Sequence, residues 1–107
     1  MAIKHVTETT EIRPDQWVCP QSQIYDRICE APRRVIKASG QRVYLAERDG
    51  RSMGSFIARK SCVYVCDTQE EGEAVYAISR EQDEAITASR KAIKAQFAAR
   101  IHALGAQ

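Results

Sequence analysis

Hydrophobic and polar residues alternate in short runs over the first two thirds of the chain, a pattern typical of β-strands. Proline and glycine separate the runs at Pro20, Pro32, Gly40, Gly50 and Gly54. The pattern predicts strands at Gln23–Cys29, Arg34–Ala38, Arg42–Arg48, Ser55–Arg59 and Ser61–Cys66. The connections between them are short, so we expect antiparallel pairing.

The clearest strand is Arg42–Arg48, where alternation puts Val43 and Leu45 on one face and Tyr44 on the other. Asp49-Gly50 follows directly, a pair that favours a type I′ hairpin turn. Gly54 lies a few residues beyond the turn and predicts a bulge or bend in the returning strand.

After Cys66 the spacing of apolar residues becomes helical. Thr68 and Glu71 have the spacing of a capping box, which predicts a short helix from about Gln69 to Ala77, weakened by Gly72. A second cap, Ser79-Arg80-Glu81-Gln82, predicts the start of a long amphipathic helix. Neither glycine nor proline interrupts this helix before Gly105.

The long helix carries one continuous apolar stripe. About 25 helical residues span about 37 Å, whereas a compact chain of this length has a diameter of about 34 Å. The helix therefore either lies across the whole sheet or overhangs it. An overhang would expose Phe97, Ile101 and Leu104 and would call for a partner, most simply a second copy of the helix forming a homodimer.

The 107 residues allow one domain of the α+β class. We divide it into a loose N-terminal arm or edge strand (1–12), a β-rich part (13–66) and a helical part (67–107). The expected fold is a small antiparallel sheet or SH3-like barrel of four or five strands, followed by a short helix and the long C-terminal helix. No apolar run suits a signal peptide or membrane span, so we expect a cytoplasmic protein without a membrane partner.

Charge is segregated along the chain although the net charge is only +2. Residues 1–66 and 90–107 are basic, and residues 67–89 are acidic. The acidic residues complement the dipoles of helix starts, and they could also dock on a basic partner. The partner-contact candidates in this block are Glu70, Glu73, Glu81, Asp83 and Glu84.

Four cysteines raise the alternative of a small structural zinc protein, with Cys19, Cys29, Cys62 and Cys66 as ligands. Cys62 and Cys66 lie on one predicted strand, about 13 Å apart, too far to share an ion. We therefore favour buried, reduced cysteines over zinc or a disulfide. The sequence predicts no cofactor.

No catalytic motif is present. The two histidines, His5 and His102, lie next to no candidate nucleophile, and the chain contains no glycine-rich phosphate loop or His-Glu-x-x-His helix. We therefore expect a protein that is not an enzyme.

Basic residues and tyrosines are mixed along the predicted strands, a combination that suits base stacking and phosphate contacts. The same arginines could equally be ordinary solvent-facing residues. The candidate nucleic-acid contacts are Arg33, Arg34, Lys37, Arg42, Tyr44, Arg48 and Arg51.

Short strands with an Asp-Gly hairpin, followed by capped helices, resemble a small SH3-like or KOW-like barrel with a helical extension. The resemblance covers about Gln16 to Asp67, with Gly40 at the place where KOW modules carry a glycine before their strongest strand. The chain also resembles small uncharacterised phage and prophage proteins. We favour a non-enzymatic binding protein that acts on a protein partner as an inhibitor or adaptor, with a nucleic-acid-binding barrel as the first alternative and the zinc protein as the second.

Overall fold

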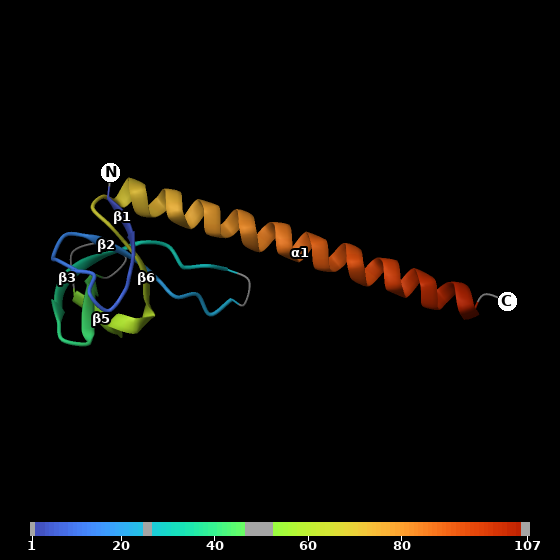
Figure 1. Cartoon of the computed structure of the whole chain (residues 1–107), viewed down its shortest axis with the longest axis horizontal. Helices are drawn as coiled ribbons and strands as arrows, with labels where there is room; N and C mark the ends of the chain where they lie inside the picture. Colours follow the sequence, from blue (N-terminus) through green and yellow to red (C-terminus); the bar gives the residue numbers. More distant parts are fainter. Residues whose placement is uncertain (1, 25–26, 47–52, 106–107) are drawn as a thin grey trace.

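The computed structural model describes residues 2–24, 27–46 and 53–105. It confirms the α+β class: one antiparallel sheet and one long helix, α1 (Gln69–Gly105), make up the protein (Figure 1). The strands are β1 (Ile3–His5), β2 (Trp17–Pro20), β3 (Arg33–Ser39), β4 (Arg42–Ala46), β5 (Met53–Ala58) and β6 (Cys62–Cys66), with a 3₁₀ turn at Arg59–Ser61.

The described strands form a six-stranded open sheet in the order β1-β6-β2-β3-β4-β5, with antiparallel neighbours throughout. The prediction of four or five strands was too low. The N-terminal arm is not wholly loose, because β1 pairs with β6 along the edge of the sheet. Ile12, farther along the arm, is buried in the core.

One predicted strand was wrong and a central strand was missed. The described residues of the stretch Gln23–Cys29, which exclude 25 and 26, lie in the loop between β2 and β3 and form no strand, and an isolated bridge joins Gln21 to Cys29. The missed strand is β2, which is covered on both faces: Val18 faces the sheet core and Cys19 lies beneath α1. A strand buried on both faces shows no alternation of polar and apolar residues. Pro20 ends β2 where its register with β6 shifts.

The sheet curves around a small apolar core. Two register irregularities accompany this curvature, one between Val35 and Lys37 of β3 and one where β4 faces β5. In the second, the extra residue lies between Met53 and Phe56, which confirms the bulge predicted at Gly54. The core consists of Ile12, Val18, Val35, Val43, Leu45, Cys62 and Val65.

The helix begins with the predicted capping box. The Glu71 amide donates to Thr68 Oγ1 at 3.2 Å, and the Thr68 amide donates to Glu71 Oε1 at 3.0 Å. The helix then continues without a break to Gly105, so the prediction of two helices was wrong. Ser79 is a buried residue within α1 rather than a second cap.

The molecule is elongated, measuring 66 × 29 × 25 Å, with a radius of gyration of 19.0 Å against about 13 Å for a compact chain of this size. Figure 1 shows the reason: α1 starts beside the sheet and projects far beyond it. Of the two arrangements that the helix length allowed, the structure has the overhang. Within the described residues, no helix has both the length and the apolar composition of a membrane span.

Candidate binding surfaces

The first turns of α1 are fixed by very close packing at Gly72. A Cβ atom at this position would lie 2.6 Å from Cβ of Pro32, closer than carbon atoms can approach. The Gly72 carbonyl also accepts a hydrogen bond from the Cys19 thiol, with 3.7 Å between sulfur and oxygen. Gly72 therefore does not merely weaken the helix, as the sequence suggested; its missing side chain lets α1 approach the sheet and the loop.

Two turns later, Ser79 binds the β2–β3 loop through the backbone amide and carbonyl of Cys29. Its hydroxyl accepts a hydrogen bond from the Cys29 amide at 3.0 Å and lies 3.2 Å from the Cys29 carbonyl, to which it can donate. Both residues are fully buried. The helix thus satisfies both backbone polar groups of Cys29 in this loop, which lies alongside α1 in Figure 1.

One further turn along, Arg27 of the same loop binds Asp83. Arg27 Nη2 lies 3.1 Å from Asp83 Oδ2, and both side chains are less than one-fifth exposed. The guanidinium also lies 6.0 Å from the centre of the Tyr76 ring. We call residues 69–86, which include all these contacts, the anchored half of α1.

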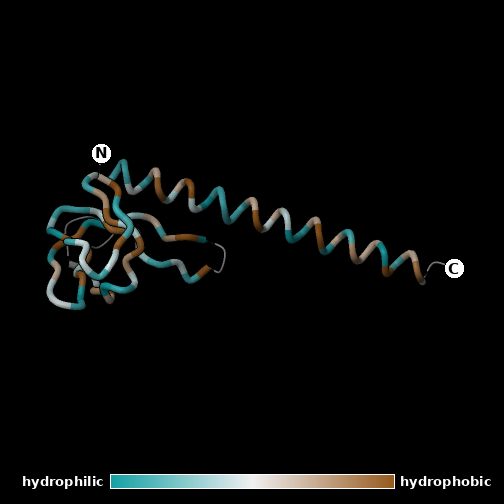
Figure 2. The backbone as a smooth tube through the Cα atoms, viewed as in Figure 1, coloured by the Kyte–Doolittle hydropathy of each residue, from teal (hydrophilic) through white to brown (hydrophobic). Residues whose placement is uncertain are grey.

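The remainder, residues 87–105, is exposed at every position, and we call it the free half. Its large apolar side chains are at least half exposed: Ile93 at 51%, Phe97 at 50%, Ile101 at 71% and Leu104 at 76%. The hydrophobic positions recur along the helix to its C-terminal end, as Figure 2 shows. The structure therefore exposes the three residues that the sequence proposed as partner contacts.

The exposed stripe continues the face by which the anchored half packs. Spacings of seven and four residues place Ser79, Ile86, Ile93 and Phe97 on one side of a helix. Ser79 is buried and Ile86 is half-buried, whereas Ile93 and Phe97 face solvent. The free half thus has the amphipathic character of a packed helix without a packing surface of its own chain.

The acidic block divides into structural and exposed carboxylates. Asp83 pairs with Arg27, and Glu71, which is buried, completes the capping box. The remaining predicted contacts, Glu70, Glu73, Glu81 and Glu84, are exposed. They all lie in the anchored half, whereas the basic residues Arg90, Lys91, Lys94 and Arg100 lie in the free half.

The four cysteines are free and buried, and the structure divides them between two sites. Cys19, Cys29 and Cys66 meet where α1 covers the sheet, and Cys62 lies in the sheet core. In the pairing of β2 with β6, Cys19 faces Tyr64 and the next residue, Pro20, faces Cys62. This register shift interrupts the alternation of side chains along β6, so Cys62 and Cys66 are not on the same face. Within the described residues, no group of three or more His, Cys, Asp or Glu side chains has metal-binding geometry.

The pKa values of Cys19, Cys62 and Cys66 are raised, whereas hydrogen bonds from Cys19 and Ser79 lower the pKa of the fully buried Cys29. Burial raises the pKa of Cys62 to about 11, although Arg59 lowers it slightly, and burial also raises the pKa of Cys66 to about 11. The pKa of Cys19 is raised by its hydrogen bond with Cys29 and by burial. A nucleophilic cysteine needs a lowered pKa, whereas the pKa values of these three are raised.

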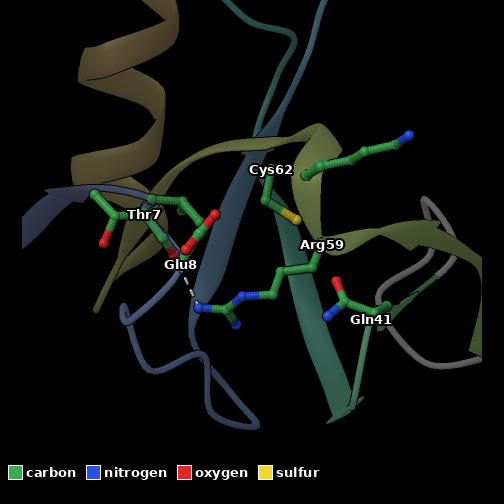
Figure 3. A pocket seen from close by; sticks show the side chains of 7 residues that line it. Thr7, Glu8, Gln41, Arg59 and Cys62 are labelled. Carbon is green, nitrogen blue, oxygen red and sulfur yellow. Dashed lines mark hydrogen bonds between the residues drawn. The ribbon is translucent and has the colours of Figure 1, made fainter.

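A pocket of about 480 Å³ lies between the N-terminal segment and the 3₁₀ turn, lined by Val6, Thr7, Glu8, Gln41, Arg59, Lys60 and Cys62. Figure 3 shows Arg59 reaching from the turn toward the segment of Thr7 and Glu8. Its guanidinium donates to the carbonyls of Thr7 and Thr10. Arg59 thus fastens the N-terminal segment, and the Cys62 thiol beside it is protonated at neutral pH.

A second exposed surface crosses strands β3, β4 and β5. Lys37 pairs with Tyr44, and Tyr44 pairs with Phe56, so the three side chains form a line across one face. Arg42 extends the line along β4. The Tyr44 and Phe56 ring centres are 5.6 Å apart, Lys37 Nζ is 4.7 Å from the Tyr44 ring centre, and Arg42 Cζ is 4.6 Å from that of Phe56. We call these four residues the cation–aromatic row.

The structure brings together only part of the basic surface that the sequence proposed. Arg33 donates to the carbonyl of Ala46 at 2.8 Å, and Arg34 forms an ion pair with Asp15, so both have structural roles. Arg48 and Arg51 lie outside the described residues. Phe56 was missed: it lies in a predicted strand, but its pairing with Tyr44 follows only from the register of β4 and β5.

Comparisons with known proteins return no matching family model, no matching curated protein and no matching solved structure.

Proposed function

We propose that this is a non-enzymatic binding protein that docks on a protein partner through the free half of α1. The observation that carries the proposal is the exposure of every residue from 87 to 105, although the apolar face of the helix continues through this segment. The anchored half supports it, because there the same face is covered.

The energetics of an isolated helix support the need for a partner. In proteins, most of the stability of a helix comes from tertiary packing of its amphipathic face, and the free half has no such packing within its own chain. Covering the exposed parts of Ile93, Phe97, Ile101 and Leu104 would contribute about 1 kcal/mol for each side chain. A partner would therefore stabilise the helix and gain affinity from the same contacts.

The partner that we propose is a second copy of this chain. A two-fold symmetric pair covers both apolar stripes at once, and each copy supplies the other with a matching helix. The free half carries basic residues and no acidic ones, so the apolar stripes rather than opposite charges would drive the pairing.

The experiment is a mass measurement by light scattering at micromolar concentrations. We expect a mass of about twice 12.0 kDa for the wild type. Phe97→Glu should give a monomer, because it places a charge in the centre of the stripe. The matched control is Ala95→Glu, which adds the same charge about 160° around the helix from Phe97 and should leave the mass unchanged.

Hydrogen exchange shows whether the free half is a stable helix without a partner. A wild-type monomer whose amides from 87 to 105 remain protected would show that the free half is stable alone, which contradicts the proposal. An equal loss of dimer in both variants would place the interface elsewhere.

We also propose that the sheet has an SH3-like architecture. The order β6-β2-β3-β4-β5, with a 3₁₀ turn leading into β6, supports an SH3-like arrangement to which β1 is added at one edge. Small barrels of this kind serve as binding modules in many contexts, so the architecture agrees with a binding role but names no ligand.

A further inference from the structure

We propose that the cation–aromatic row of Lys37, Arg42, Tyr44 and Phe56 is a binding site for single-stranded nucleic acid. This proposal is independent of self-association through α1, because it concerns a different surface and a different class of ligand. It rests on three features of the row: the half-exposed ring of Phe56 beside the partly buried ring of Tyr44, two cations that form no ion pair among the described residues, and a rigid support.

The rings are arranged as a platform. Tyr44 and Phe56 are cross-strand partners with centres 5.6 Å apart and planes inclined at 52°. Phe56 is 51% exposed, which is unusual for a phenylalanine on a regular strand of a small sheet. An aromatic face of this kind offers a nucleobase a stacking surface that does not depend on base identity.

Among the described residues, the partners of the two cations of the row are the aromatic rings. Lys37 and Arg42 are exposed, and among the described residues neither forms an ion pair with a carboxylate. A neighbouring arginine shows the contrast: Arg34 on β3 is paired with Asp15. Positive charge at the row is therefore available to phosphate, and the planar guanidinium of Arg42 can also stack with a base.

The row is held by the best-packed part of the sheet. Val35, Val43 and Leu45, on the opposite face of β3 and β4, are at most 1% exposed. The bulges between Val35 and Lys37 and between Met53 and Phe56 set the register that lines up the four side chains. The binding groups are thus positioned before a ligand arrives, which lowers the entropic cost of binding.

The chemistry of the row selects the ligand. Duplex DNA hides the faces of its bases in the stack, so it could use the two cations but not the rings. An acidic peptide likewise offers charge without flat aromatic groups. A single strand presents phosphates and accessible base faces side by side, which match the cations and rings that lie beside one another in the row.

The test is a fluorescence anisotropy titration of the full chain with a labelled mixed-sequence DNA single strand of about 12 nucleotides. The corresponding duplex and polyglutamate serve as competitors. We expect the single strand to bind in the micromolar range at low salt, the competitors to bind at least about tenfold more weakly, and affinity to fall as salt rises.

Variants of the Phe56 ring and of the two cations separate the contribution of stacking from that of charge. Phe56→Leu keeps an apolar side chain without a ring and should weaken binding about 5- to 50-fold, whereas Phe56→Tyr should retain it. The double variant Lys37→Gln, Arg42→Gln should reduce the slope of log K against log salt by about 1.4, for two lost phosphate contacts. The matched control, Lys91→Gln with Lys94→Gln, removes the same charge from the free half and should leave the slope nearly unchanged.

Three results would overturn the proposal. These are absence of binding at low salt, equal competition by polyglutamate with no effect of Phe56→Leu, and a loss of binding in the helix control but not in the row variants. Circular dichroism of each variant shows whether it is folded, and Phe56→Tyr provides a folded reference that retains the ring. Loss of dimer in Phe97→Glu without loss of oligonucleotide binding would show that the two surfaces act separately.

Discussion

The anchored and free halves of α1 differ little in amphipathic pattern but greatly in environment. In the anchored half, Gly72, Ser79 and Asp83 each bind or closely pack against the sheet or the β2–β3 loop. In the free half, Ile93, Phe97 and Leu104 lie on the corresponding side of the helix and remain exposed. Polar contacts and close packing therefore fix where α1 attaches to the sheet and the β2–β3 loop, whereas the apolar stripe indicates only that this face of the helix suits a packing partner.

The largest expected contrast between the halves is in thiol reactivity. A cysteine introduced by Ala95→Cys, on the exposed free half, should react rapidly with a thiol reagent at pH 8. The four native thiols are buried, so they should react at least about a thousandfold more slowly, at a rate set by local opening. Absorbance with a disulfide reagent measures both phases.

The control is the wild-type protein, which should show only the slow phase until denaturant releases all four thiols. Rapid reaction of Cys19, Cys29 or Cys66 would show that the interface between α1 and the sheet opens easily, and the distinction between the halves would be lost.

A smaller effect is expected from adding one methyl group at the contact of α1 with the loop. Gly72→Ala should lower the free energy of unfolding by about 2–3 kcal/mol, because the new Cβ would lie 2.6 Å from Cβ of Pro32. Urea denaturation followed by circular dichroism measures the change.

The same substitution at the other end of α1 is the control. Gly105 has no neighbouring atom within 4 Å of an added Cβ, so Gly105→Ala should change stability by less than about 0.5 kcal/mol. A stabilised Gly72→Ala variant would mean that the helix stands farther from Pro32 than described.

The smallest of these effects is expected from removing one hydroxyl. Ser79→Ala should cost about 1–2 kcal/mol, because it leaves the amide and carbonyl of Cys29 buried without their partner. Faster hydrogen exchange at the Cys29 amide would identify the cause.

Ser89→Ala gives the comparison, since Ser89 is exposed on the free half of the same helix. Alanine has the higher helix propensity, so this variant should be neutral or slightly stabilising. If both serine variants behaved alike, the hydrogen bonds of Ser79 would contribute nothing measurable.

Local sequence rules predicted those features whose causes are local. Thr68 and Glu71 form the capping box because both partners lie within one turn, and the bulge near Gly54 needs only a residue without a side chain. The α+β class likewise followed from the change of period after Cys66.

The features that the sequence did not predict depend on distant partners. Ser79 has the spacing of a helix cap, but its buried hydrogen bonds to Cys29, 50 residues away, keep it inside one helix. The strand β2 gave no alternating pattern because α1 and the core cover its two faces. Within the cation–aromatic row, Lys37, Arg42 and Tyr44 were predicted as surface residues, whereas their alignment with Phe56 required the register of three strands.

The absence of a break in α1 has a mechanical consequence. No glycine or proline lies between Glu73 and Leu104, so the helix has no residue at which it would readily bend where it leaves the sheet. The free half is therefore a lever about 28 Å long, rigidly joined to the body that carries the cation–aromatic row. In a pair of such molecules the helices would act as a spacer, and the distance and angle between the two sheets would be fixed by where the levers cross.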